Sequence, residues 1–318
     1  MTDGGSGREP LARLRTLPLL LLFGLIACTS GGRVATGPAG PESGPPLSVI
    51  TSITVLADLI RQVGGDRVEV KPLVPSGADP NTFQPAPRDV VSVSHAGIVF
   101  FNGLGLDRTV RTVVSNAARP ELPVVVLADG LPTIENDLTV IDRGPGAARG
   151  NPYLWLDPRN ARVYVERIRD GLTAVDPAGA ATYRENAATY LDLMSALDDE
   201  LAKQVATITP RRRKLVTLHD AFPYLAERYG LELVGVVIKT PGRQPSAQEV
   251  ADVSRAMRQY EVPTVFTEPQ LDARLLKLAA RDAGINISTL YSDTLDQAVP
   301  TYEALLRYNA RHLVNGLQ

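Results

Sequence analysis

Residues 47–74 read LSVITSITVLADLIRQVGGDRVEVKPLV, and this stretch decides the fold class. Residues 47–53 and 67–74 are short runs rich in β-branched and apolar residues, which is typical of strands. Between them, apolar residues recur on one helical face until two glycines end the helix. That face consists of Val55, Leu56, Leu59, Ile60 and Val63. A strand, a helix and a second strand in this order predict a parallel α/β unit.

The same alternation continues along the chain in two series. The first series adds strand-like runs at 98–102 and 124–127. The second series has four such runs, with helical patterns between them, at 214–218, 232–237, 264–267 and 287–290. A folded part longer than about 250 residues usually divides into more than one core. We therefore predict two doubly wound α/β lobes, at 47–176 and 210–318.

A long helix is predicted between the two series, within residues 177–209. From 178 to 208, apolar residues follow one another at spacings of three and four: Tyr183, Ala187, Tyr190, Met194, Leu197, Leu201, Val205 and Ile208. Such a helix would be roughly 45 Å long, enough to cross both lobes. The alternative is an amphipathic helix packed on one lobe. We favour a rigid connecting helix, which argues against large hinge motion, because the α/β pattern stops before it and restarts after it.

The N-terminus has the features of a secretory signal over residues 1–27. Three arginines, Arg8, Arg13 and Arg15, precede an apolar run at 17–27. This run is far short of the ~20 residues that span a bilayer as a helix. A basic stretch, a short apolar segment and a small residue at the end are typical of a signal peptide.

Cys28, which is the only cysteine of the chain, directly follows this apolar run. Leu25-Ile26-Ala27-Cys28 resembles the lipobox of bacterial lipoproteins, which implies that Cys28 is acylated and becomes the new N-terminus. The alternative is a buried free cysteine that happens to follow a signal. Residues 28–46 are rich in Gly, Pro and Ser, so we expect a disordered tether. This arrangement predicts a lipid-anchored protein on the extracytoplasmic face of the cell membrane.

Composition excludes several function classes. Without residues 1–27 the chain has 30 basic and 33 acidic residues, so it carries no basic excess for nucleic acid. An α/β hydrolase is disfavoured because the chain has no G-x-S-x-G nucleophile motif and its single cysteine is assigned to the anchor. The lone G-x-G at 103–105 is insufficient for nucleotide binding. We therefore do not expect an enzyme.

Four segments lie where ligands bind in open α/β sheets, beyond the carboxyl ends of the strands. They are PSGADPNTFQP at 75–85, NPYLWLDP at 151–158, VTLHDAF at 216–222 and LYSD at 290–293. For the first two, turn chemistry is the alternative interpretation. For the others, Asp220 and Asp293 could be helix caps.

Taken together, these segments resemble the solute-binding lipoproteins of zinc- and manganese-type ABC importers. The resemblance covers residues 47–318 and includes FNGLGLD at 101–107, QPSAQEVADV at 244–253 and FTEPQ at 266–270. It implies two α/β lobes joined by one long helix, with a metal cleft between the lobes. It also implies a monomer that captures a divalent metal ion, Zn²⁺ or Mn²⁺, and delivers it to an ABC permease and its ATPase.

The resemblance further implies four metal-ligand positions. His219 and Asp293 match the family's third and fourth ligands, whereas Asn81 and Tyr153 stand where histidines are expected. Zinc favours nitrogen and thiolate donors, and a phenol ionises only near pH 10. We therefore expect a preference for harder ions such as Mn²⁺, or Fe³⁺ if the metal ionises Tyr153, or else a weakened site. The alternative is a degenerate member with lost or changed metal binding, acting as a binding or interaction lipoprotein, with Tyr153 filling the vacant site.

Three other residues are not expected to bind the metal ion. His95 and His312 are interpreted as satisfied surface or core histidines, and residues 130–150 contain no histidine. Glu268 follows a strand end and could approach the cleft. We favour for it the role of a helix N-terminal charge before Leu271.

Overall fold

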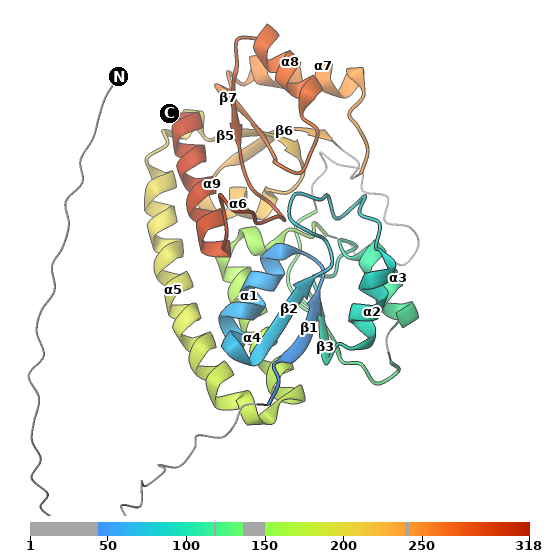
Figure 1. The fold of residues 1–318 in the computed structure, drawn as a ribbon. Coiled ribbons are helices and arrows are strands. Elements are labelled where there is room, and N and C mark those ends of the chain that lie inside the picture. The colour runs from blue at the N-terminus through green and yellow to red at the C-terminus, as the bar shows by residue number, and fades with distance from the viewer. Residues whose placement is uncertain (1–43, 118, 136–149, 239–241) are drawn as a thin grey trace, which may run out of the picture. The chain divides into compact units, whose positions relative to one another are not determined.

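The structure is a computed structural model that describes residues 44–117, 119–135, 150–238 and 242–318. Cys28, the predicted signal and most of the predicted tether lie outside the described residues. The described residues form one compact unit, within which two lobes can be distinguished (Figure 1). None of the described helices is long and apolar enough to cross a membrane.

The N-terminal lobe is built on a four-stranded parallel sheet in the order β2-β1-β3-β4. The helices α1 and α4 pack against each other, and α2 packs against α3. The elements of this lobe are β1 (Leu47–Thr51), α1 (Thr54–Gly64), β2 (Val68–Pro72), α2 (Pro87–Ser94), β3 (Ile98–Phe101), α3 (Arg108–Ala117), β4 (Val124–Val126) and α4 (Pro158–Val175).

The C-terminal lobe repeats this plan with a parallel sheet in the order β6-β5-β7-β8. Its elements are β5 (Lys214–His219), α6 (Pro223–Tyr229), β6 (Glu232–Ile238), α7 (Ala247–Gln259), β7 (Thr264–Thr267), α8 (Arg274–Asp282), β8 (Asn286–Thr289) and α9 (Tyr302–Leu317). Short 3₁₀ turns lie at Gly65–Arg67, Leu154–Leu156, Pro177–Gly179 and Pro210–Arg212. The prediction of two doubly wound parallel lobes is therefore confirmed.

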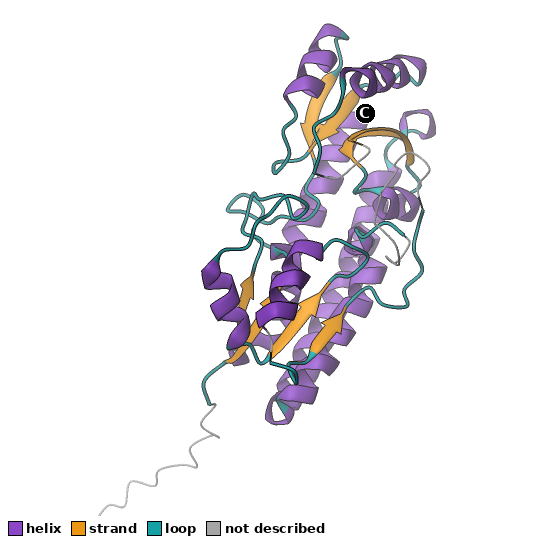
Figure 2. Cartoon of the chain, turned by 90° about the vertical axis from the view of Figure 1, so that its right-hand side faces the viewer, coloured by secondary structure: helices purple, strands orange, loops and turns teal. Residues whose placement is uncertain are grey.

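The long helix between the lobes is α5 (Ala180–Ala206), with 27 residues and a length of about 40 Å. Every apolar position that the spacing predicted within this helix is buried. The helix contacts α1 and α4 of the N-terminal lobe and α6 and α9 of the C-terminal lobe. In the side view of Figure 2, long helices lie behind the strands of the N-terminal sheet. Helix α5 therefore packs along both lobes, and the alternative of a helix packed on one lobe is wrong.

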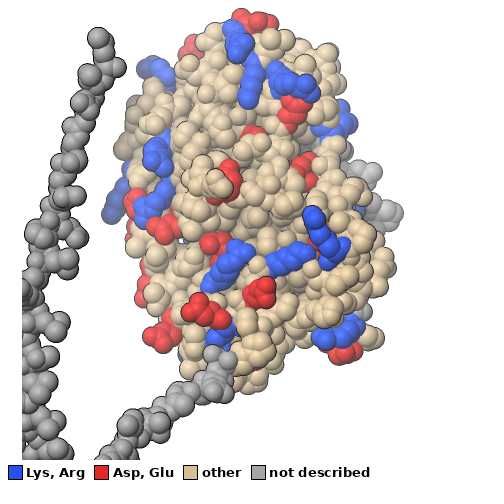
Figure 3. Space-filling view, viewed as in Figure 1, with Lys and Arg blue, Asp and Glu red and all other residues tan. Residues whose placement is uncertain are grey.

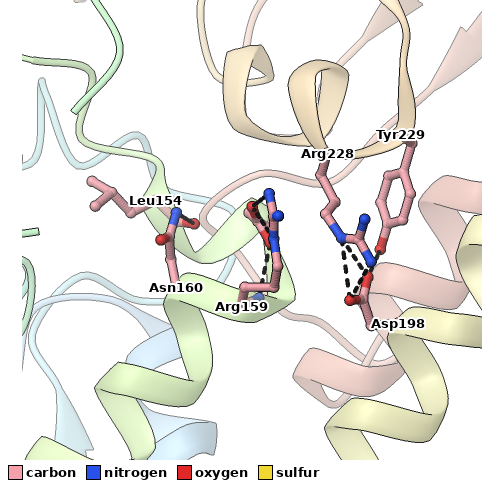
Figure 4. A network of polar contacts seen from close by, with 7 residues as sticks. Leu154, Arg159, Asn160, Asp198, Arg228 and Tyr229 are labelled. Atoms are coloured by element: carbon pink, nitrogen blue, oxygen red, sulfur yellow. Dashed lines mark hydrogen bonds and ion pairs between the residues drawn. The ribbon is translucent and has the colours of Figure 1, made fainter. Parts of the chain in front are cut away.

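Each lobe is also bound to α5 by an Arg–Asp–Tyr group. At the N-terminal end, Asp176 accepts from Arg67 at 2.8 Å and from the hydroxyl of Tyr183. Further along, Asp198 accepts from Arg228 at 2.6 Å and from the hydroxyl of Tyr229, both on α6 (Figure 4).

The apolar core explains why the lobes form one unit. One cluster of buried side chains continues from the first sheet through α5 to α6 and α9, and the second lies within the C-terminal lobe. On the face shown in Figure 3, basic and acidic side chains are interspersed, and neither sign forms a continuous patch there.

Candidate metal site

The candidate site lies beyond the carboxyl ends of the second sheet, where α/β folds place ligands. His219 is the last residue of β5, Glu268 directly follows β7, and Asp293 follows β8. All three are at least 95 % buried, with exposed fractions of 4 %, 3 % and 3 %. Parallel strands bring their carboxyl ends to one edge, so residues distant in sequence meet there.

Glu268 contacts His219 directly, with 2.7 Å between Oε1 and Nδ1. Its other oxygen, Oε2, accepts from the hydroxyl of Ser292 at 2.5 Å. The prediction that Glu268 is a helix N-terminal charge is wrong, because the next helix, α8, begins only at Arg274. The strand end instead directs the carboxylate toward the imidazole. The sequence placed Glu268 after a strand, from which it could approach the cleft, but it did not indicate His219 as the partner.

Tyr153 approaches the same imidazole from the N-terminal lobe. Its hydroxyl lies 2.7 Å from Nε2 of His219, and the two rings meet edge to face with centroids 5.0 Å apart. The side chain of Asn81 interacts with this hydroxyl. Asp79 in turn orients Asn81, accepting from its backbone N–H at 2.8 Å and from its amide at 2.9 Å.

Asp293 completes the set of predicted positions. Its charge acts on both Tyr153 and His219, so Asp293 lies within electrostatic range of these two predicted residues. Within the described part of the chain, its Oδ1 is buried without a hydrogen-bond partner. The alternative role of cap for the last helix does not apply, because Thr301 caps α9.

The pKa values reflect an excess of acidic groups around one imidazole. Burial alone would lower the pKa of His219, but the charge and hydrogen bond of Glu268 raise it to about 9. Burial, and then the charge of Glu268, raise the pKa of Asp293 well above its usual range. Burial also raises the pKa of Tyr153, followed by the charges of Asp293 and Glu268. Such an arrangement favours an added cation.

A cavity of about 240 Å³ leads to this cluster from the surface. Asp79 and Asn81 line it from the N-terminal lobe, and His219, Gln270 and Asp272 line it from the C-terminal lobe. Among the residues that the structure describes, no group of three or more His, Cys, Asp or Glu side chains is arranged to hold a metal ion. At the two predicted positions of the N-terminal lobe, the available donors are the neutral oxygens of Asn81 and Tyr153.

Several hydrogen bonds join the two lobes around the cluster. The indole N–H of Trp155 donates to the carbonyl of Ser292 at 2.8 Å, and the hydroxyl of Tyr302 donates to the carbonyl of Trp155. Asn151 donates to the carbonyl of Asp220 at 2.7 Å. Asp220 is not the cap of α6, whose N-cap is Phe222. The lobes therefore meet closely at the site.

The remaining histidines lie elsewhere. His95 is the C-cap of α2, with Nδ1 2.8 Å from the carbonyl oxygen of Val91. His312 lies on α9, where its ring stacks on Tyr308 at 3.9 Å. Neither belongs to the cluster around His219.

Comparisons with known proteins agree with this fold. The family model of the zinc-uptake complex component A periplasmic proteins matches residues 49–316. The manganese-binding lipoprotein MntA of Halalkalibacterium halodurans is 30% identical over 297 residues, which cover 92% of this chain and 96% of that protein. The iron-binding protein YfeA of Yersinia pestis is 30% identical over 279 residues, covering 86% of this chain and 88% of that protein.

Solved structures show the same architecture. A Mn-bound periplasmic metal binding protein from Candidatus Liberibacter asiaticus superposes with a TM-score of 0.73 at 26% identity, over 86% of this chain and 100% of that one. A crystal structure of ZnuA shares the fold at 23% identity, with a TM-score of 0.74 and the same coverage. The chain therefore belongs to the family of the zinc-uptake complex component A periplasmic proteins.

Proposed function

We propose that the protein is the extracytoplasmic solute-binding receptor of a metal-ion ABC importer, which captures a divalent metal ion between its lobes and delivers it to a permease. The observation that carries this proposal is the buried imidazole of His219, which contacts Glu268 on one side and faces Tyr153 across the lobe interface on the other. An Asp293 oxygen without a partner among the described residues is a costly feature unless it has a ligand to bind. Membership in the family supports the same function.

The donor set favours a hard ion over zinc. His219 Nε2 would supply the one nitrogen, and the Asp293 carboxylate, the Tyr153 hydroxyl and the Asn81 amide would supply oxygens. Zinc sites are typically rich in imidazole and thiolate, whereas oxygen donors suit Mn²⁺. We therefore propose Mn²⁺ as the transported ion. The relatives MntA and YfeA are named as manganese-binding and iron-binding proteins, which is consistent with this choice.

The site also has a property that favours the alternative function. The hydroxyl of Tyr153 lies against Nε2 of His219, the nitrogen that a metal would need. A member that has lost metal binding and acts as an interaction lipoprotein would keep this contact permanently. In a receptor, metal binding would break the contact between Tyr153 and His219. The metal ion would then bind both His219 Nε2 and the Tyr153 oxygen. The names of the relatives support the receptor.

The anchor and partners belong to the same proposal. Acylation of Cys28, followed by the tether at 28–46, would hold the receptor on the outer face of the cell membrane beside its permease and ATPase. Relatives named as lipoproteins, including MntA and a manganese ABC transporter substrate-binding lipoprotein of Streptococcus pneumoniae, support this arrangement.

Metal titration of the mature protein, after removal of bound metal by a chelator, tests the function. We expect one Mn²⁺ per chain and no strong preference for Zn²⁺. Asp293→Asn should lower the Mn²⁺ affinity by at least about 100-fold, because loss of an outer-shell partner alone typically costs 10–100-fold. The control is Asp272→Asn, which removes a carboxylate at the cavity wall that is paired with Arg274.

The outcomes separate the two functions. If the wild-type protein binds neither Mn²⁺ nor Zn²⁺, the receptor proposal is rejected in favour of the interaction lipoprotein. If Asp272→Asn weakens binding as much as Asp293→Asn, the effect is one of general charge, and Asp293 is not a ligand.

A further inference from the structure

Glu268 and Asp293 are two buried carboxylates at one site, and their surroundings differ. Both oxygens of Glu268 are engaged, Oε1 with His219 and Oε2 with Ser292. Asp293 Oδ1 has no partner among the described residues. A carboxylate with both oxygens occupied is poorly placed to bind an ion, whereas one with a vacant oxygen is well placed. The two acids therefore have different roles.

We propose that Glu268 is a positioning residue, which keeps Nδ1–H of His219 bonded within the C-terminal lobe and so presents Nε2 to the metal. This inference rests on the proposed function. Histidine ligands generally donate their second ring N–H to a carboxylate or carbonyl, which fixes the ring and strengthens the metal-binding nitrogen. In this protein the Nδ1 side faces Glu268, and the Nε2 side faces Tyr153 at the lobe interface.

The position of Glu268 is itself fixed by its neighbours. Gln270 donates to the hydroxyl of Ser292 at 2.8 Å, and Ser292 donates to Glu268. The carbonyl of Ser292 accepts from Trp155, two residues from Tyr153. The imidazole is thus connected on both sides to residues 153–155 of the N-terminal lobe. Nε2 contacts Tyr153 directly, and Nδ1 is connected to Trp155 through Glu268 and Ser292. A carboxylate held at 0% side-chain exposure can turn very little, so the ring should be equally restricted.

Glu268→Gln is the matched variant, because it keeps the shape and removes the charge. We expect Mn²⁺ affinity to fall by about 10–100-fold, as for other outer-shell partners of metal-bound histidines. The control Asp272→Asn removes a cavity-wall carboxylate that is paired with Arg274, and it should bind Mn²⁺ like the wild type. If Glu268→Gln binds Mn²⁺ like the wild type, the inference is wrong although the proposed function stands. If the wild type binds no metal, both fail.

A metal-free readout distinguishes positioning from a general structural role. The chain has only three histidines, so ¹⁵N-labelled imidazoles can be assigned with His95→Gln, His219→Gln and His312→Gln. The wild type and Asp272→Asn should show a downfield, slowly exchanging Nδ1–H signal from His219. In Glu268→Gln this signal should move upfield and exchange faster. An unchanged signal would contradict the inference.

If Glu268→Gln does not fold, the wild-type protein can still test the positioning role of Glu268. Loaded with ¹¹³Cd²⁺, it should show coupling between the metal and Nε2 of His219 while Nδ1–H is retained. Coupling to Nδ1, or no binding of Cd²⁺ or Mn²⁺ at all, would overturn the positioning role.

Discussion

The two lobes contribute unequally to the candidate site. The C-terminal lobe provides His219, Glu268 and Asp293 from strand ends, and all three are ionisable and buried. The N-terminal lobe provides the neutral side chains of Asn81 and Tyr153 from segments between regular elements. Three ionisable side chains of the site therefore come from one lobe, and the other lobe covers them and adds the carboxylate of Asp79 at the cavity wall.

At α5 the two lobes are, by contrast, nearly equivalent. Each is joined to this helix by one arginine, one aspartate and one tyrosine, as Arg67–Asp176–Tyr183 and Arg228–Asp198–Tyr229. The inequality at the site is therefore not a result of weaker attachment of one lobe. It arises from the residues at the two N-terminal-lobe positions, and this can be tested by changing them.

Tyr153→His would give the N-terminal lobe an imidazole and remove the inequality. We expect the Zn²⁺ affinity to rise by about 100-fold, or about 2.8 kcal/mol, because a nitrogen donor replaces a neutral phenol. Competition with a zinc-binding dye would measure the change. The control Tyr153→Phe adds no donor and should give no gain. Equal Zn²⁺ affinity in the wild type and Tyr153→His would show that position 153 does not bind the ion.

Asp198→Asn tests the attachment of the C-terminal lobe to α5. It would deprive Arg228 of a bidentate carboxylate and weaken the bond to Tyr229, so we expect the free energy of unfolding to fall by about 2 kcal/mol. Urea unfolding measures this loss, and Mn²⁺ affinity should not change. The exposed neighbour Asp199 provides the control Asp199→Asn, which should have little effect. A loss of metal affinity in Asp198→Asn would show that this contact also shapes the site.

Acid should weaken the corresponding attachment of the N-terminal lobe. Burial would raise the pKa of Asp176, but hydrogen bonds from Tyr183 and Arg67 hold it below its ordinary value. The contribution is therefore complete above the unfolded-state pKa of about 3.9 and is lost as the pH falls through the lower folded-state value. We expect Asp176→Asn to cost about 1 kcal/mol at pH 6 and progressively less below pH 4.

Urea unfolding at a series of pH values would measure this difference. Asp170→Asn, which removes an exposed partner of Arg169, is the control and should show no such dependence. A cost of Asp176→Asn that stays constant down to pH 2 would contradict the assignment.

The sequence by itself determined the fold and half of the chemistry. Strand and helix periodicities are local, so they identified both parallel sheets and the buried face of α5. The position of His219 at a strand end followed from the same pattern, and the replacement of expected histidines by Asn81 and Tyr153 was visible in the residues alone.

Only the tertiary structure decided how these residues act on one another. Glu268 lies 49 positions from His219, and Tyr153 lies 66 positions from it. No local pattern indicates that a charged residue after β7 faces an imidazole at the end of β5, so the sequence favoured a helix-end charge for Glu268. The contact arises because parallel strands bring their carboxyl ends to one edge of the sheet, which the N-terminal lobe then covers.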